Sequence, residues 1–214
     1  MDDVTVMPRG REFTREDLDA MPEDGNRYEL LDGLLVVTPA PGTRHQAVLT
    51  ELLFRLRGAC PPHLRVRCAP LDVALGPGTV VQPDLLVAPR AAFTDRDLPV
   101  APLLAVEILS PSTRLYDLTH KRSALEAAGC PHYWVVDPDT PSITAWTLTD
   151  GHFRQTGYAA ADQTFTTRHP FPLTFRPAGQ SSRSAGRALL QAVGWNDGRA
   201  DGEVRGPLTL LGGP

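Results

Sequence analysis

Residues 103–138 read LLAVEILSPSTRLYDLTHKRSALEAAGCPHYWVVDP. The first seven positions are apolar except for Glu107, a pattern typical of a central strand buried on both faces. Ser110-Pro111-Ser112 ends this strand, and Ser112 or Thr113 can cap a helix from about 114 to 128 that closes at Gly129. A second strand follows at 133–136. Strand, helix and strand at this spacing predict a crossover unit.

The sequence on either side predicts further strands and helices. On the N-terminal side we expect a helix capped near Thr14, a hairpin of 27–31 and 34–37 with Asp32-Gly33 as its turn, and a long helix over 43–58. Strands near 64–68, 71–75 and 80–87 follow. On the C-terminal side we expect outer strands at 142–148 and 152–158.

Composition and charge narrow the class of protein. The 214 residues carry a net charge of −4 and no basic block, which counts against a constitutive DNA-coating protein but not against an enzyme. The first residues have neither a basic nor an apolar region, and no apolar stretch approaches membrane length, so we expect neither a secretory signal nor a membrane helix. Three cysteines without a CxxC pair predict reduced thiols in a cytoplasm, and scattered histidines argue against a zinc site.

Lys121 is the only lysine among 21 basic residues. A chain this rich in arginine is expected to use lysine where a compact charge with an adjustable pKa is needed, as in water activation or phosphate contact. Asp117 precedes Lys121 by one helical turn, so a solvated i,i+4 ion pair is the alternative interpretation.

Two acids stand in apolar runs upstream of this lysine. Asp84 follows Pro83 at the entry of a strand, and Glu107 lies inside the run 103–109. A buried carboxylate is costly unless it is paired or binds a cation, so two acids and a lysine suit a divalent metal and a phosphodiester. The alternatives are a turn aspartate that accepts backbone hydrogen bonds at 84, and pairing of Glu107 with Arg114.

Other positions carry weaker signals. Glu29 lies in the first hairpin and is either a site acid or a solvent-facing strand residue. His45 begins the long helix, where capping or packing is the favoured interpretation. Gln82 has no independent support. The aromatic pair at 133–134 can stack on bases, although aromatics in an apolar strand usually belong to the core.

Together these motifs resemble the Uma2 family of putative restriction endonucleases, within the PD-(D/E)XK nuclease superfamily. The resemblance covers about residues 12–176 and keeps the order of the motifs. They are RYELLDG at 27–33, PGTRHQ at 41–46, QPD at 82–84, VEILSPST at 106–113, Asp117 with Lys121, and YWVVDP at 133–138.

The resemblance implies a fold and a domain plan. The fold is α/β of the α+β type, a restriction-endonuclease-like core with a mixed central sheet flanked by helices, plus an N-terminal helix and hairpin. This domain spans 12–178. Residues 1–11 are then an N-terminal extension, and 179–214 are a tail rich in Gly, Ser and Arg that we expect to be largely disordered.

The resemblance also implies a metal site. Asp84 and Glu107 match the acids that hold Mg²⁺, for which Mn²⁺ can substitute, and the backbone carbonyl of Ile108 is the expected third ligand. The superfamily's usual lysine position is a leucine here, so Lys121 in the following helix is the matching residue. Glu29 matches an additional acid of the family.

The first functional hypothesis is therefore Mg²⁺-dependent hydrolysis of DNA by a cytoplasmic homodimer, with no membrane and no small-molecule cofactor. His45, Gln82 and Asp117 are its accessory residues. The second hypothesis is a non-catalytic binding or assembly module on the same fold, which metal should not stabilise. A nuclease acting on RNA or on modified or branched DNA is the third.

Overall fold

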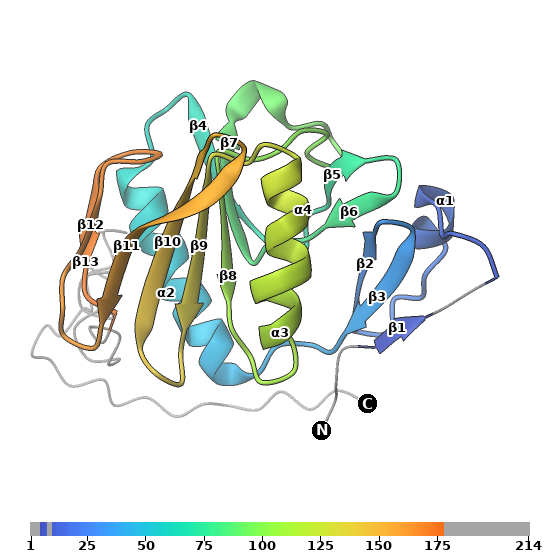
Figure 1. Cartoon of the computed structure of the whole chain (residues 1–214), viewed down its shortest axis with the longest axis horizontal. Coiled ribbons are helices and arrows are strands. Elements are labelled where there is room, and N and C mark those ends of the chain that lie inside the picture. The colour runs from blue at the N-terminus through green and yellow to red at the C-terminus, as the bar shows by residue number, and fades with distance from the viewer. Residues whose placement is uncertain (1–4, 8–9, 178–214) are drawn as a thin grey trace, which may run out of the picture. The chain divides into compact units, whose positions relative to one another are not determined.

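A six-stranded mixed sheet forms the centre of the computed structural model, which describes residues 5–7 and 10–177 (Figure 1). Its strand order is β11-β10-β9-β8-β7-β4. Strands β8 and β9 run parallel, and the other neighbours run antiparallel. The strands are β4 (Leu64–Cys68), β7 (Leu85–Pro89), β8 (Leu104–Ile108), β9 (His132–Asp137), β10 (Ser142–Thr149) and β11 (His152–Ala160). The mixed sheet and the crossover between β8 and β9 are confirmed.

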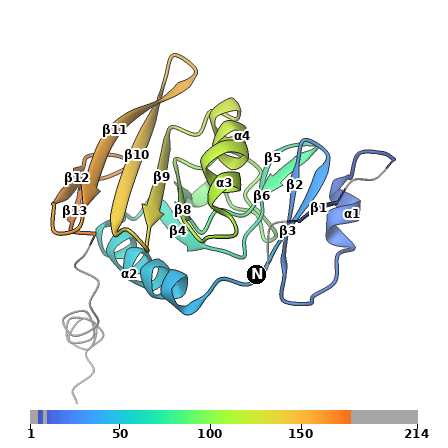
Figure 2. The ribbon, with the colours of Figure 1, turned by 60° about the horizontal axis from the view of Figure 1, so that its bottom comes forward.

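Helices cover both faces of this sheet (Figure 2). Helix α2 (Thr43–Ala59) packs on one face through Val48, Leu52 and Leu56, which share a core cluster with alternate residues of β8. On the other face, Leu125 of α4 (Arg122–Ala127) shares a core cluster with Ala105 of β8 and with Tyr133 and Val135 of β9. Strand β8 is buried at every position, as its apolar sequence predicts.

A second sheet of five strands carries the N-terminal hairpin. Its order is β1-β3-β2-β6-β5, with bounds β1 (Thr5–Met7), β2 (Arg27–Leu31), β3 (Leu34–Thr38), β5 (Val73–Gly76) and β6 (Thr79–Val81). The hairpin turn has positive φ at Asp32 (49°) and Gly33 (76°), as a two-residue turn requires. Strand β1 lies in the predicted N-terminal extension, so part of that segment extends the sheet.

The chain passes from one sheet to the other at residues 82–84. The sequence predicted one strand over 80–87, but β6 ends at Val81 and β7 begins at Leu85. Pro83 has no N–H to donate to a sheet, which favours a break at this point. Asp84 therefore lies immediately before β7, at the junction of the two sheets.

The predicted helix over 114–128 is present as three consecutive segments. They are α3 (Arg114–Tyr116), a π-helical turn (Asp117–Lys121) and α4, and Gly129 follows with φ of 79°. The predicted side-chain cap is wrong, because Thr113 at the N-cap makes no such bond and Ser110 Oγ instead accepts from the Thr113 N–H at 3.3 Å. Single π turns inside α-helices are frequent at functional sites.

The remaining elements are peripheral. Helix α1 (Arg15–Asp19) begins with the predicted cap, where Thr14 and Asp17 form a reciprocal capping box. A 3₁₀ turn, η1 (Arg90–Ala92), follows β7, and β12 (Phe165–Thr167) pairs with β13 (Leu173–Phe175). None of the helices in the described ranges is long and apolar enough to cross a membrane. The predicted tail 179–214 lies outside the described residues.

Candidate active site

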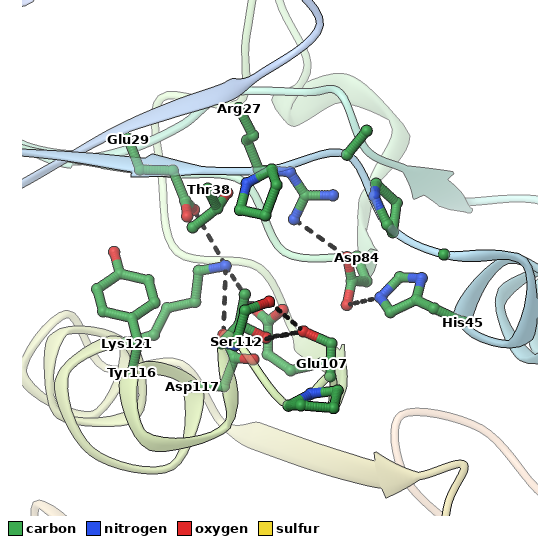
Figure 3. A pocket seen from close by; sticks show the side chains of 17 residues that line it. Arg27, Glu29, Thr38, His45, Asp84, Glu107, Ser112, Tyr116, Asp117 and Lys121 are labelled. Atoms are coloured by element: carbon green, nitrogen blue, oxygen red, sulfur yellow. Dashed lines mark hydrogen bonds and ion pairs between the residues drawn. The ribbon is translucent and has the colours of Figure 1, made fainter. Parts of the chain in front are cut away.

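A pocket of about 410 Å³ lies where β2, the start of α2 and the π-helical turn meet (Figure 3). It brings together side chains from five separate parts of the chain. The predicted residues that line it are Glu29, His45, Asp84, Glu107, Asp117 and Lys121. Each of these six residues is almost fully buried, with an exposed fraction of 7% or less.

Lys121 lies at the centre of the acids. Its Nζ is 3.0 Å from Glu29 Oε1, 3.1 Å from Glu107 Oε1 and 3.9 Å from Asp117 Oδ1. It also donates to the backbone carbonyl of Gln82 at 3.3 Å. Burial alone would lower the pKa of Lys121, but the three carboxylates prevail and raise that pKa well above its usual value. The lysine is therefore a fixed positive charge.

Asp84 is held on both oxygens. Oδ1 accepts from Arg27 Nη1 at 3.1 Å, while Oδ2 accepts from the Ile108 N–H at 2.8 Å and lies 2.9 Å from His45 Nε2. Burial opposes ionisation of Asp84, but the hydrogen bond to His45 and the charges of Arg27, His45 and Lys121 hold its pKa well below the usual value. Because an ionised carboxylate only accepts, Nε2 of His45 is the donor. Its Nδ1 is buried and has no hydrogen-bond partner among the described residues.

The site holds more buried negative than positive charge. Four carboxylates, those of Glu29, Asp84, Glu107 and Asp117, face only two fixed cations. Burial raises the pKa of Glu107 well above its usual value, and the neighbouring acids raise it further against the opposing charge of Lys121. Burial likewise raises the pKa of Asp117 to about 6. The cluster thus resists full ionisation unless additional positive charge enters.

The geometry decides between the alternative interpretations. Arg114 pairs with Asp137 at 2.8 Å instead of Glu107, which rules out the proposed partner of the buried strand acid. Glu29 is buried, not solvent-facing, and the Asp117–Lys121 pair is not solvated. The favoured packing interpretation of His45 was incomplete, because its ring contacts Asp84 in the pocket.

The structure also places the other predicted residues. Gln82 takes part only through its backbone, because its side chain donates to Asp72 at 2.8 Å while its N–H donates to Glu29 at 2.5 Å. Ile108 does not line the pocket, although its N–H binds Asp84. Tyr133 and Trp134 are buried in the core, which confirms the interpretation of these aromatics as core residues and not as surfaces for stacking on bases.

Arg27 and Tyr116 also line the pocket and were not predicted. A signal for Arg27 was available, because residues two apart on a strand face the same side and Glu29 was already a candidate. The buried hydroxyl of Tyr116 has no hydrogen-bond partner in the described part of the chain, and its ring centroid lies 5.7 Å from Lys121 Nζ. An apolar helix position gives no sign of such a role in the sequence.

The donor set fits a divalent cation by charge. Within the described residues, no three His, Cys, Asp or Glu side chains form a ready-made ligand cluster. Mg²⁺, however, is usually held by one or two carboxylates with several waters. Glu107 Oε1 is buried against Lys121 Nζ, and the excess of two carboxylates over fixed cations matches the charge of one divalent ion.

Comparison with known proteins places the chain in a family. A crystal structure of a putative nuclease belonging to DUF820 from Anabaena variabilis ATCC 29413 matches with a TM-score of 0.57 and 19% identity, over 71% of this chain and 85% of that chain. This likeness supports the fold. No curated protein matches. Residues 15–184 match the Uma2 family, described as "Putative restriction endonuclease". Since this match spans most of the chain, the protein belongs to the Uma2 family.

Proposed function

We propose that this protein is an endonuclease that hydrolyses phosphodiester bonds of DNA with the help of Mg²⁺. The observation that carries the proposal is the lysine buried among four carboxylates at a pocket. Structural ion pairs rarely need such an excess of buried acid, whereas sites that handle a metal and a phosphate do. Family membership supports the same reaction class.

Asp84 and Glu107 would hold the ion, with the Ile108 carbonyl as the remaining candidate ligand from the chain. Mn²⁺ should substitute. When bound, the ion polarises the scissile phosphate and lowers the pKa of a bound water. His45 and Arg27 keep Asp84 ionised and fix its orientation, so both act as positioning residues for the metal ligand.

Lys121 acts in this proposal as a cation and not as a base. Its raised pKa keeps the ammonium charged, so it has no lone pair with which to accept a proton. It can instead donate a hydrogen bond that orients the attacking water and can offset the charge that develops on the phosphate. Glu29 holds the ammonium in place from the opposite side of the pocket.

A thermal-shift titration with Mg²⁺ and Mn²⁺ tests the metal site. The wild type should gain stability, by about 2.7 kcal/mol at a hundredfold excess over the Kd. Asp84→Asn should lose this gain. Asp137→Asn is the matched control, because Asp137 is also a buried, arginine-paired acid but does not line the pocket, and it should keep the gain.

Cleavage of supercoiled plasmid, linear duplex and RNA should be assayed in parallel. Metal-dependent cutting of DNA by the wild type and by Asp137→Asn, but not by Asp84→Asn, is the expected result. If the protein cuts RNA and not DNA, RNA would replace DNA as the proposed substrate. Unchanged cutting by Asp84→Asn would refute the assignment of the site.

A non-catalytic binding module on the same fold is the second candidate. It is favoured by Asp84 having partners on both oxygens before any metal binds, and by the net charge of −4. Absence of a metal-dependent shift in the wild type would select this candidate.

Cutting both strands of a duplex takes two sites, so the nuclease proposal includes a homodimer, which sedimentation velocity tests.

A further inference from the structure

Basic side chains gather at one free edge of the six-stranded sheet, outside the pocket. Strand β4 is the outermost strand on that side and pairs along its length with β7. Arg65 and Arg67 are two residues apart on β4 and so face the same side of the sheet. Arg90, in the 3₁₀ turn after β7, donates its N–H to the carbonyl of His63 at 2.9 Å, which places Arg90 beside the start of β4.

Arg57, in the last turn of α2, completes this group. We call it the arginine patch: Arg57, His63, Arg65, Arg67 and Arg90. Arg57, His63 and Arg90 are exposed, and the other two are half-buried. The positive charge of Arg90, followed by burial and the charges of Arg67 and Arg57, lowers the pKa of Arg65. The patch therefore has a strong local positive field in a chain of net charge −4.

The arginine patch also lacks counter-charges. No carboxylate within residues 5–7 and 10–177 forms an ion pair with any of its four arginines. Arginines elsewhere, such as Arg15, Arg96 and Arg114, each pair with at least one aspartate. Four arginines without acids concentrate positive potential in the way that anion-binding surfaces do.

The arginine patch leads away from the pocket along β4. Strand β4 ends at Cys68, and the N–H of the next residue, Ala69, donates to the carbonyl of Asp84 at 3.1 Å. At a rise of about 3.3 Å per residue, Arg67 lies about 7 Å and Arg65 about 13 Å along the strand from that contact. One extended polyanion can therefore reach both the arginine patch and the pocket.

We propose that the arginine patch binds the phosphate backbone of duplex DNA whose neighbouring phosphates reach the pocket. This inference rests on the proposed function, because it assigns the surface that holds the same substrate. The arginine guanidinium is suited to phosphate recognition, and contacts to phosphate fix the position of the duplex without reading its sequence.

The arginines have a simpler use that must be weighed. Charges on an edge strand block pairing with other chains, and a basic residue in the last turn of a helix interacts favourably with the helix dipole. Those uses account for Arg65, Arg67 and Arg57 singly. They do not account for Arg90, which belongs to neither β4 nor α2, nor for the convergence of three elements without an acid.

Binding without cleavage tests the inference. The affinity for a labelled DNA duplex is measured by fluorescence anisotropy in EDTA, at salt concentrations between about 50 and 200 mM. Two patch variants, Arg65→Gln/Arg67→Gln and Arg57→Gln/Arg90→Gln, are compared with Arg154→Gln/Arg168→Gln. The control removes the same charge from two exposed arginines that form no ion pair within the described part of the chain.

Each lost phosphate contact should reduce the magnitude of the slope of log K against log salt concentration by about 0.9. At about 0.1 M salt this change corresponds to about eightfold weaker binding for each contact. Each patch variant should therefore bind about 60-fold more weakly, and the control should stay within about threefold of the wild type. Equal weakening in all three variants, or none in the patch variants, overturns the inference.

Cleavage measured in parallel separates this inference from the proposed function. If the wild type cuts DNA and the patch variants cut with unchanged KM, the arginine patch is wrong and the nuclease stands. If the wild type binds duplex through the patch but never cuts with any metal, the patch stands and the proposed function fails. A wild type that binds no duplex even at low salt overturns both.

Discussion

Replacing Lys121 by methionine should destabilise the metal-free protein strongly at pH 7.5. The ammonium lies 3.0 Å and 3.1 Å from two buried carboxyl oxygens, and its attraction to an ionised one is about 5 kcal/mol at an effective dielectric constant of about 20. Desolvation of the ammonium offsets much of this. Removing one partner of a buried ion pair typically costs about 3–5 kcal/mol, because the other partner stays buried and uncompensated.

The effect should depend on the charge that remains. In Lys121→Met/Glu107→Gln one carboxylate is neutralised together with the lysine, so the excess of negative charge returns to the wild-type value. We expect the double variant to be about 1–3 kcal/mol more stable than Lys121→Met alone. Arg114→Met is the control, because it removes a cation whose own side chain is 53% exposed from its pair with Asp137 and should cost less than about 1 kcal/mol.

Urea denaturation in EDTA measures all four proteins. The free energy of unfolding is compared at pH 7.5, with the slope against denaturant checked for each variant. If the free energy of unfolding of Lys121→Met lies within about 0.5 kcal/mol of the wild-type value, the lysine does not compensate buried acids. That result would refute both its fixed charge and its proposed role. A double variant no more stable than the single one would refute the pairing with Glu107.

Two further predictions concern other buried groups. Burial raises the pKa of Asp117 to about 6, above its unfolded value, so the folded wild type should lose up to about 3 kcal/mol as the pH rises from about 4 to 6 in EDTA. Asp117→Asn should remove that loss, so the gain in stability of the variant over the wild type should be larger at pH 7.5 than at pH 4. An equal difference between the two proteins at both pH values would contradict the raised pKa. Burial also raises the pKa of the Cys130 thiol to about 12, so a thiol reagent should label the half-buried Cys60 and Cys68 in the native protein and Cys130 only on unfolding. Labelling of all three at one rate would contradict its burial.

Local sequence patterns determined many of the elements of this protein. The apolar run around Glu107 identified the central strand, because a short strand covered on both faces is apolar at successive positions and Pro111 follows the run closely. Asp32-Gly33 identified the hairpin turn, and Thr14 and Gly129 identified two helix ends, since each of these features depends on neighbouring residues alone. The order of acids and lysine was likewise visible in the sequence.

Only the tertiary structure decided how these residues meet. The period-two pattern of a strand predicts that Glu29 and Arg27 face the same side of β2. It does not predict that a second sheet and a helix close over that side. The break at Pro83, which brings Asp84 to the junction of the two sheets, and the reach of Lys121 to acids 14 and 92 residues earlier in the chain depend on contacts between distant segments. Distances between such segments are set by packing of the whole core, and no short stretch of sequence contains them.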